Sequence, residues 1–243
     1  MKSANRKHQG HQLPPTWQIT NLPSDLALIT AWSICSMGLI SSLYTFFKPD
    51  WALTATAKNM AKNVKIPDGY FMQWTGNYES KGLGIVYNNA TFENSFDESL
   101  PYAIPIKYED IFILAFWPTK IEKNQTYTKL ARKIIEHYAV ELKRNDSIIT
   151  GDFNLYHKKD IPNKAADIIE IDELLNSLGF KSLYHELRGE AFGSETKKTY
   201  FHRFKEDDAF FLDYTYSNFP IKKYELLDWD KEFSDHRGQV IEF

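Results

Sequence analysis

Cysteine is almost absent from this 243-residue sequence, and neither sign of charge prevails. The single cysteine, Cys35, excludes an internal disulfide framework, and no group of cysteines and histidines has the spacing of a zinc site. The 29 basic and 32 acidic residues give a net charge of −3, which argues against a generally basic nucleic-acid coat but leaves room for a local basic groove. The chemistry of this chain must therefore come from residues other than cysteine.

A linker rich in glycine, serine or proline is also missing, while 43% of the residues are hydrophobic and 15% are aromatic. This composition excludes a disordered or fibrous chain and predicts one substantial core. Met1–Pro15 has no apolar period and is typical of a flexible leader. We therefore expect one domain over residues 16–243.

The run Leu26–Phe47 contains no charged residue and is long enough to span a bilayer as a helix. Several serines and threonines and Gly38 make the run only moderately apolar. The sequence therefore favours a helix packed inside the domain, followed by a buried strand at Trp51–Thr56. We expect a cytoplasmic protein without a stable protein partner, and a membrane anchor behind the basic leader is the lesser alternative.

Short apolar runs bounded by turn-forming residues predict the strands of the remaining chain. They are Gly82–Tyr87, Ile111–Trp117, Ser147–Ile149, Phe210–Tyr216 and Gly238–Phe243. Apolar residues three and four positions apart predict helices over Tyr127–Leu142 and Ala165–Leu178, the second capped by Gly179. Because strands outnumber helices and alternate with them, the fold class is a layered α/β or α+β structure.

Polar residues stand where three of these strands run into loops, in Gly151–Asn154, Leu212–Tyr214 and Ser234–His236. Each segment alone is typical of an ordinary turn or surface loop. Together they hold the parts of a phosphoryl-transfer site. The aspartates offer hard oxygen ligands for Mg²⁺ or Mn²⁺, the asparagine offers an amide for a phosphate oxygen or a water, and the histidine can donate to a phosphate.

The order and spacing of these segments resemble the motifs of the endonuclease/exonuclease/phosphatase superfamily, the DNase I-like fold. Lys81–Ile85 and Phe116–Pro118 match two further segments, so the resemblance runs from about Tyr70 to the end of the chain. It implies a four-layer α/β-sandwich in which two mixed sheets pack face to face with helices outside. It also implies a divalent-metal site where the strand ends meet, and hydrolysis of phosphodiesters in DNA or RNA, of phosphomonoesters or of lipid phosphates.

The resemblance also implies a role for each site residue. Asp152 would orient or deprotonate the attacking water, Asn154 would position phosphate and water, and His236 would stabilise the phosphate with Asp213 as its partner. Asp235, together with Asp152, would bind the metal. The substrate-binding candidates are Asn154, Trp117, His202 and Arg203.

The N-terminal quarter departs from the family pattern. Thr16–Gln18 has glutamine where members have asparagine, and the glutamate expected after Lys48–Asp50 falls at or near Thr56. A hydroxyl supplies neither the charge nor the short oxygen contacts that Mg²⁺ prefers, so we expect weakened metal binding. Glu79 is a poor substitute on spacing, and the indole of Trp117 cannot shuttle a proton to a leaving group.

We therefore expect a phosphodiester hydrolase that depends on Mg²⁺ or Mn²⁺, above all a nuclease, acting on nucleic acid or another phosphoester. The alternative is a catalytically impaired phosphate- or nucleic-acid-binding domain that keeps the fold. Basic pairs such as Lys197–Lys198 and Lys222–Lys223 would form either a rim for a phosphate backbone or ordinary solvated surface.

Overall fold

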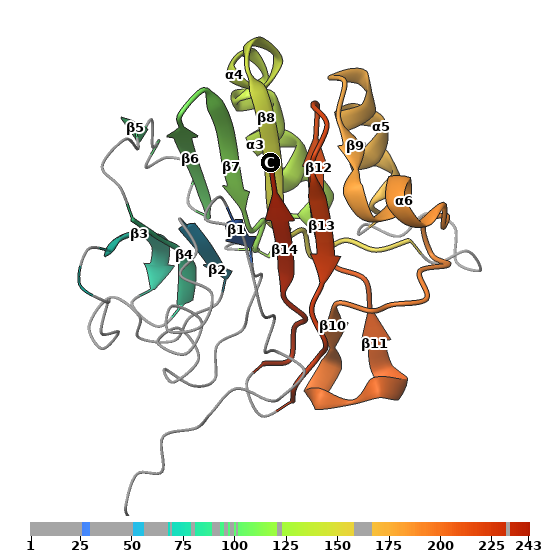
Figure 1. Ribbon diagram of the computed structural model, residues 1–243. Coiled ribbons are helices and arrows are strands. Elements are labelled where there is room, and N and C mark those ends of the chain that lie inside the picture. The colour runs from blue at the N-terminus through green and yellow to red at the C-terminus, as the bar shows by residue number, and fades with distance from the viewer. Residues whose placement is uncertain are drawn as a thin grey trace, which may run out of the picture.

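The computed structural model describes residues 26–29, 51–55, 68, 70–78, 81–88, 93–94, 97, 100, 102–120, 123–157, 167–231 and 234–243. In these parts the strands form two six-stranded sheets and a small two-stranded ribbon (Figure 1). The first sheet has the order β13-β14-β1-β2-β4-β3. These strands are β13 (Lys223–Leu226), β14 (Gln239–Glu242), β1 (Leu26–Ile29), β2 (Trp51–Ala55), β4 (Lys81–Asn88) and β3 (Tyr70–Tyr78).

The second sheet has the order β5-β6-β7-β8-β12-β9. Its strands are β5 (Glu93–Asn94), β6 (Ala103–Tyr108), β7 (Ile111–Phe116), β8 (Asp146–Asp152), β12 (Asp213–Ser217) and β9 (Lys181–Ser182). β7 and β8 are parallel, and the chain passes between them through helices α3 (Tyr127–His137) and α4 (Ala139–Arg144). The first sheet also contains one parallel pair, β1 and β2, so both sheets are mixed.

Buried aliphatic side chains from both sheets form one cluster, so the two sheets pack against each other. Leu83 and Ile85 come from β4, Ile113 from β7 and Ile241 from β14. The other face of the second sheet packs on α3, α4, α5 (Ile169–Ser177) and α6 (Leu183–Arg188) through a second, more aromatic cluster. Successive strand residues point to opposite faces. Ile148 of β8 accordingly joins the first cluster and Ile149 joins the second.

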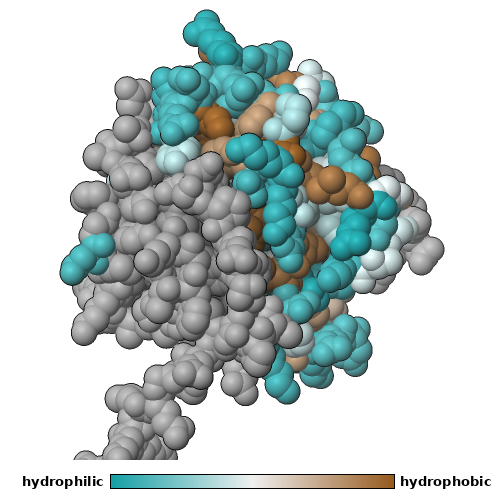
Figure 2. Space-filling view, in the orientation of Figure 1, coloured by the Kyte–Doolittle hydropathy of each residue, from teal (hydrophilic) through white to brown (hydrophobic). Residues whose placement is uncertain are grey.

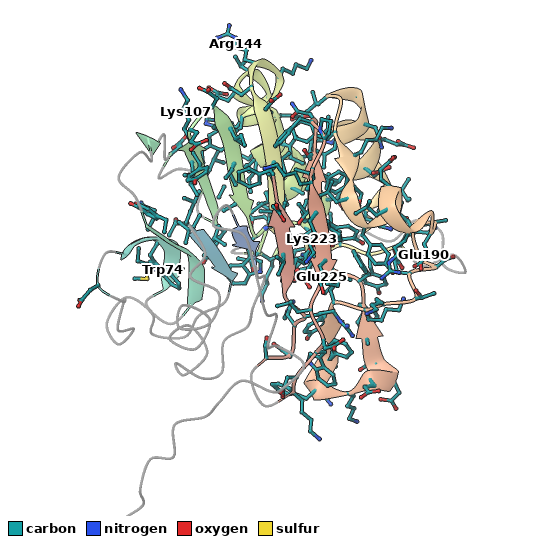
Figure 3. The ribbon with its side chains drawn as sticks, viewed as in Figure 1. Trp74, Lys107, Arg144, Glu190, Lys223 and Glu225 are labelled. Carbon is teal, nitrogen blue, oxygen red and sulfur yellow. The ribbon has the colours of Figure 1, made fainter. Side chains whose placement is uncertain are left out.

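The described part of the chain thus has a mixed α/β architecture with a sheet, a second sheet and a helical layer. The helices expected on the outer face of the first sheet fall outside the described residues. Polar side chains cover most of the described surface in Figure 2, with apolar side chains in smaller groups between them. The exposed Lys107 and Arg144 lie at the end of the molecule opposite the ribbon of β10 (Tyr200–Phe201) and β11 (Ala209–Phe210) (Figure 3).

Most of the predicted elements are present, and two differ in an instructive way. The predicted helix Tyr127–Leu142 is broken at Tyr138, where ψ is 11° and the buried ring packs on Phe112. The predicted strand Phe210–Tyr216 is two strands, β11 and β12. It divides because the backbone N–H groups of Leu212 and Asp213 donate to the hydroxyl of Thr199 instead of to a neighbouring strand.

The prediction that a helix begins at Leu26 is wrong, because Leu26–Ile29 is strand β1. This strand pairs antiparallel with β14 and parallel with β2, and it thereby joins the two ends of the domain. A short apolar run satisfies a strand as well as a helix, so periodicity cannot decide between them. The rest of Leu26–Phe47, the leader Met1–Pro15 and Cys35 lie outside the described residues. No helix of the described part is long and apolar enough to cross a membrane.

Candidate active site

Two neighbouring strand ends bring Asp152 and Asp213 together. β8 ends with Asp152, β12 begins with Asp213, and the two residues are direct partners in the antiparallel ladder. Directly opposed residues project from the same face of a sheet, so their carboxyl groups face a common space. Both side chains are buried.

Gly151 makes this close packing possible. Its φ is +148°, and a Cβ at this position would lie 1.9 Å from the carbonyl oxygen of Phe116 on the parallel strand β7. Any side chain would push β7 and β8 apart at the point where both strands enter the site. The glycine of the Gly151–Asn154 segment is therefore required by backbone packing.

His236 completes the centre of the site. Its Nδ1 lies 2.9 and 3.0 Å from the two carboxylate oxygens of Asp213. Its backbone N–H donates to the hydroxyl of Ser234 at 2.9 Å, and the ring of Tyr200 lies against the imidazole at a centroid distance of 4.7 Å. Asp213 and Tyr200 therefore hold the imidazole, Ser234 holds the backbone beneath it, and Nε2 is the ring nitrogen left for chemistry.

The carboxylates around His236 favour its charged form. Burial by itself lowers the pKa of the imidazole, but the charge and hydrogen bond of Asp213 and the charges of Asp152 and Asp235 raise that pKa to about 9. His236 is thus an imidazolium at neutral pH, with Nδ1–H donated to Asp213. An Nε2–H carried by an imidazolium is a strong donor to a phosphate oxygen.

The surroundings of Asp152, by contrast, favour its neutral form. Burial raises the pKa of its carboxyl group to about 7, and the negative charge of Asp213 adds to this, while the charge of His236 opposes it. The backbone N–H of Asn154 donates to Oδ1 of Asp152 at 2.8 Å, and the side chain of Trp117 also hydrogen-bonds the carboxylate. A carboxyl group with a pKa near neutrality is suited to exchange protons with water.

Asn154 sits in a left-handed turn, with φ at +53°. Its side-chain Nδ2 donates to the carbonyl oxygen of Pro118 at 3.2 Å, which ties the end of β8 to the end of β7. This contact fixes the direction of the amide and leaves Oδ1 without a contact to Pro118. Asn154 therefore adjoins Asp152 at the mouth of the site, as expected from the sequence.

The structure also identifies a residue that the sequence analysis missed. Thr199 is completely buried, and its hydroxyl oxygen accepts the backbone N–H groups of Leu212 and Asp213 at 2.9 and 3.0 Å. Its hydroxyl also forms a hydrogen bond with the side chain of Asp213. All of these partners lie far from Thr199 in the sequence, so no local pattern pointed to it.

One of the four substrate-binding candidates, Trp117, needs correction. Trp117 is 2% exposed and packs edge-to-face on Tyr102, so the indole supports Asp152 from inside the core instead of facing a substrate. Arg203 is exposed on the tip that joins β10 to β11 and forms no described contact with the site residues. His202 reaches the site indirectly, because its Nδ1 lies 3.0 Å from the hydroxyl of Tyr200.

The basic pairs also differ in their surroundings. Lys198 lies 3.7 Å from the buried carboxylate of Glu195, and Lys223 lies 2.9 Å from Glu225 on the same strand, β13 (Figure 3). Lys222 donates to the carbonyl oxygen of Phe243. Lys198, Lys222 and Lys223 therefore each have a contact within the chain.

Asp152 and Asp235 have the right chemistry for a divalent cation, but they do not make a complete metal site. Their carboxylate oxygens are the hard ligands that Mg²⁺ prefers, and a cation would relieve the repulsion between the buried charges of Asp152 and Asp213. Within the described ranges, however, no three His, Cys, Asp or Glu side chains are grouped so that they could hold a metal ion. Gln18, Thr56 and Glu79 lie outside these ranges.

Solved structures share this architecture at low sequence identity. The 3′ phosphatase NExo from Neisseria, solved with a product DNA hairpin, matches 89% of this chain and 99% of its own with a TM-score of 0.69 and 15% identity. The fold is that of the endonuclease/exonuclease/phosphatase superfamily. An AP endonuclease from Archaeoglobus fulgidus also matches 89% of this chain and 99% of its own, with a TM-score of 0.66 and 17% identity.

A third solved structure shares the DNase I-like fold. The endonuclease domain of TRAS1, a telomere-specific non-LTR retrotransposon, covers 90% of this chain and 97% of its own with a TM-score of 0.60 and 13% identity. No family model matches the sequence, and no curated protein matches it. The likeness is therefore one of fold, and it appears in the comparison of structures and not in the comparison of sequences.

Proposed function

We propose that this chain hydrolyses phosphodiester bonds in nucleic acid. The observation that carries the proposal is the buried pair formed by Asp213 and His236, which lies beside the ionisable Asp152 at the ends of β8 and β12. The DNase I-like fold, and the DNA hairpin bound by one protein that shares it, support nucleic acid as the substrate class. The complete four-layer sandwich of the superfamily is part of the same proposal.

In the proposed reaction a water molecule attacks the phosphorus atom, and the bond to the leaving oxygen breaks. Asp152 orients this water and accepts its proton. The imidazolium of His236 donates from Nε2 to a phosphate oxygen as negative charge builds up there. Asp213 keeps the imidazole charged and aligned, and Asn154 positions the phosphate or the water from the mouth of the site.

A divalent cation is the proposed cofactor. Asp152 and Asp235 would hold Mg²⁺ or Mn²⁺ together with ligands from outside the described residues, and the bound ion would supply charge stabilisation on the phosphate. The substitution of the expected glutamate by Thr56 supports an activity that is weak or that needs a high metal concentration.

A nuclease assay tests the proposal. Plasmid DNA and single-stranded DNA and RNA oligonucleotides are incubated with the protein and Mg²⁺ or Mn²⁺, and in parallel with EDTA. We expect metal-dependent cleavage by the wild type and a loss on the order of 10²–10⁴-fold in Asp152→Ala, because the base is removed. Asp110→Ala, an exposed aspartate in the turn between β6 and β7, is the matched control and keeps wild-type activity.

Two results would go against a nuclease. Equal cleavage by the wild type and Asp152→Ala would identify a contaminating enzyme. Absence of cleavage, combined with tight binding of the oligonucleotides, would favour the second candidate, a nucleic-acid-binding domain that keeps the fold. That candidate is supported by the incomplete set of metal ligands in the described residues.

A further inference from the structure

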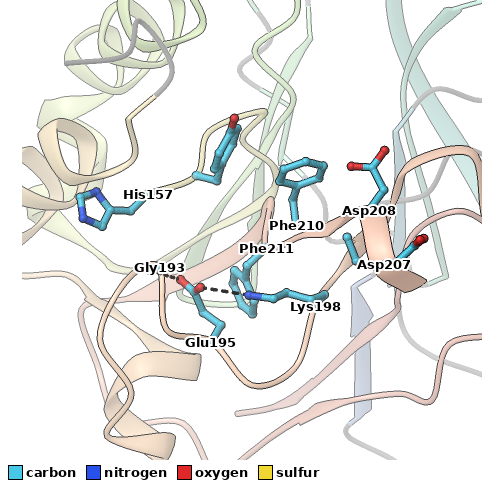
Figure 4. A pocket seen from close by; sticks show the side chains of 10 residues that line it. His157, Gly193, Glu195, Lys198, Asp207, Asp208, Phe210 and Phe211 are labelled. Atoms are coloured by element: carbon cyan, nitrogen blue, oxygen red, sulfur yellow. Dashed lines mark hydrogen bonds and ion pairs between the residues drawn. The ribbon is translucent and has the colours of Figure 1, made fainter. Parts of the chain in front are cut away.

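A pocket of about 440 Å³ opens beside the candidate active site (Figure 4). It lies between the loop that follows β8, the loop around Gly193–Lys198 and strand β11. Its volume falls within the range of roughly 300–1,000 Å³ that is usual for small-molecule sites. None of the proposed catalytic residues lines it, so the mechanism leaves it unused.

A series of aromatic rings connects this pocket to His236. The ring of Tyr200 lies against the imidazole at 4.7 Å, and it stacks on Phe210 at a centroid distance of 6.4 Å and an interplanar angle of 27°. Phe210 lines the pocket, and so does Tyr156, which follows Asn154 by two residues. A nucleotide whose phosphate sits at His236 therefore has its neighbouring groups within reach of the pocket.

The lining combines aromatic faces with an excess of carboxylates. Tyr156 and Phe210 form one wall, with their ring centroids 5.0 Å apart. The carboxylates belong to Glu195, Asp207 and Asp208, and Figure 4 draws Asp208 beside the ring of Phe210. These groups accept hydrogen bonds and repel anions.

The basic groups of the lining do not reverse this balance. Lys198 is the only lysine or arginine among the lining residues that the structure describes, and its Nζ lies 3.7 Å from Glu195. His157 is turned to Asp167, with Nδ1 3.1 Å from that carboxylate. The pocket is consequently unsuited to a phosphate group and suited to a flat, neutral group that donates hydrogen bonds.

We propose that this pocket receives an unpaired nucleobase with an exocyclic amino group, from a nucleotide next to the phosphate at His236. Adenine, guanine and cytosine carry such donors, which carboxylates accept, whereas thymine and uracil lack them. The base stacks on Phe210 and Tyr156, as bases stack on aromatic side chains in single-strand-binding proteins. This inference rests on the proposed function, because it assigns a nucleotide to the site at His236.

The test uses fluorescein-labelled oligothymidylates that contain one adenine, guanine, cytosine or abasic tetrahydrofuran at successive positions. Binding is measured by fluorescence anisotropy in EDTA, and cleavage is measured with Mg²⁺ or Mn²⁺. We expect one position at which the amino-bearing bases are preferred over thymine by about tenfold. Phe210→Leu lowers binding of these oligonucleotides by roughly 5- to 100-fold, the range for loss of base stacking, and leaves the tetrahydrofuran oligonucleotide unaffected.

A second variant tests the carboxylates without touching the rings. Asp208→Asn, in combination with Asp207→Asn, removes the preference for amino-bearing bases, and both residues are exposed, so folding is not at risk. Phe219→Ala and Asp110→Asn are the controls, because both lie outside the pocket, and they keep the wild-type preference.

The two measurements separate this inference from the proposed function. Cleavage without any base preference, or an equal effect of Phe210→Leu on the tetrahydrofuran oligonucleotide, overturns the pocket assignment and leaves the nuclease in place. Base-selective binding in EDTA, without cleavage in Mg²⁺ or Mn²⁺, supports the pocket assignment and overturns the proposed nuclease activity.

Discussion

At the scale of single residues, the protonation states in the site are set by ionisable groups that have little access to water. Asp152, Asp213 and His236 are all buried, so each depends on the others for its protonation state. A buried aspartate alone would be protonated and a buried histidine alone would be neutral. Placed together, they keep the imidazole charged and leave one carboxyl group close to its titration point. This arrangement makes the stability of the folded protein depend on pH.

The first prediction concerns this dependence in the metal-free protein. The pKa of His236 is raised from 6.5 to about 9, so its contribution is fully present below pH 6.5 and is lost as the pH rises through 9. The free energy of unfolding should therefore fall by about 3 kcal/mol between these values. The raised pKa of Asp152 acts in the same direction up to about pH 7.

Urea unfolding in EDTA across this pH range measures the effect. His236→Gln keeps a polar side chain of similar size but cannot titrate, so its stability should change much less between pH 7 and 9. A wild-type protein whose stability is constant or rises over that interval would show that His236 is neutral in the folded state.

The residues that the sequence identified and those that it missed differ in one respect. Asp152, Asn154, Asp213 and His236 stand in short segments at strand ends, and such segments are recognisable without coordinates. The buried position of Trp117 and the part played by Thr199 depend on partners that are distant in sequence, so spacing could not reveal them. The pocket near Phe210 likewise draws its lining from separate loops.

At the scale of elements, hydrogen bonds and ring stacking connect the β10–β11 ribbon to the Ser234–His236 segment. The backbone of Phe201 donates to the carbonyl oxygen of Asp235, and the backbone of Arg237 donates to that of Thr199. Trp229 stacks on Phe201 at 3.8 Å and donates from its indole to the carbonyl oxygen of Ser234. The segment that carries His236 is therefore positioned by the ribbon, and Thr199 stands at the start of that ribbon.

The second prediction is that Thr199→Val weakens both the fold and the site. Valine has the same shape but leaves the buried N–H groups of Leu212 and Asp213 without their acceptor, at a cost of about 1–3 kcal/mol for each group. Asp213 also loses a hydroxyl that holds its carboxylate. Unfolding by urea should give a total loss of about 2–6 kcal/mol, and kcat on an oligonucleotide should fall more than KM changes.

Thr199→Ser retains the hydroxyl and should restore most of both properties, which a role in packing alone would not explain. Thr196→Val is the matched control, because the Thr196 hydroxyl donates to Glu190 at an exposed position. If the valine variant at position 199 unfolds like this control, the hydroxyl does not position Asp213.

The elements also show how far periodicity can predict a fold. Runs of alternating or continuous apolar residues located β4, β7, β8 and β14 correctly. β7 and β8 bury side chains on both faces of their sheet, and β4 and β14 contribute buried residues to the cluster between the two sheets. The same reasoning assigned Leu26 to a helix. Pairing with β2 and β14 decides that β1 is a strand, and such long-range pairing has no local signature.

At the scale of the whole molecule, the first sheet joins the beginning of the chain to its end. Ile29 at the end of β1 pairs with Gln239 at the start of β14, directly after the segment that carries Asp235 and His236. β2 runs parallel to β1, with Ile29 opposite Leu53. The last residue of β2, Ala55, therefore lies at the same end of the sheet as the segment that carries His236.

This topology supports the third prediction, that an acidic residue introduced after β2 strengthens metal binding. Thr56→Glu together with Gln18→Asn restores the residue types of the superfamily pattern, and an added carboxylate ligand supplies the charge that Mg²⁺ or Mn²⁺ requires. Isothermal titration with Mn²⁺ should give an affinity on the order of tenfold higher than that of the wild type, because the number of charged ligands tunes the affinity for a divalent cation. The phosphodiesterase activity should rise at low metal concentration.

Two further variants in the same series test at which position the missing carboxylate belongs. Thr54→Glu and Lys58→Glu shift the carboxylate by two residues, which keeps the same face if the strand alternation continues and changes its distance from His236. The variant that binds Mn²⁺ most tightly identifies the position at which the wild type lacks a ligand. Strong Mn²⁺ binding and high activity in the wild type, with no gain from any of the three substitutions, would mean that another residue already supplies the carboxylate, and the inference of a weakened metal site would be wrong.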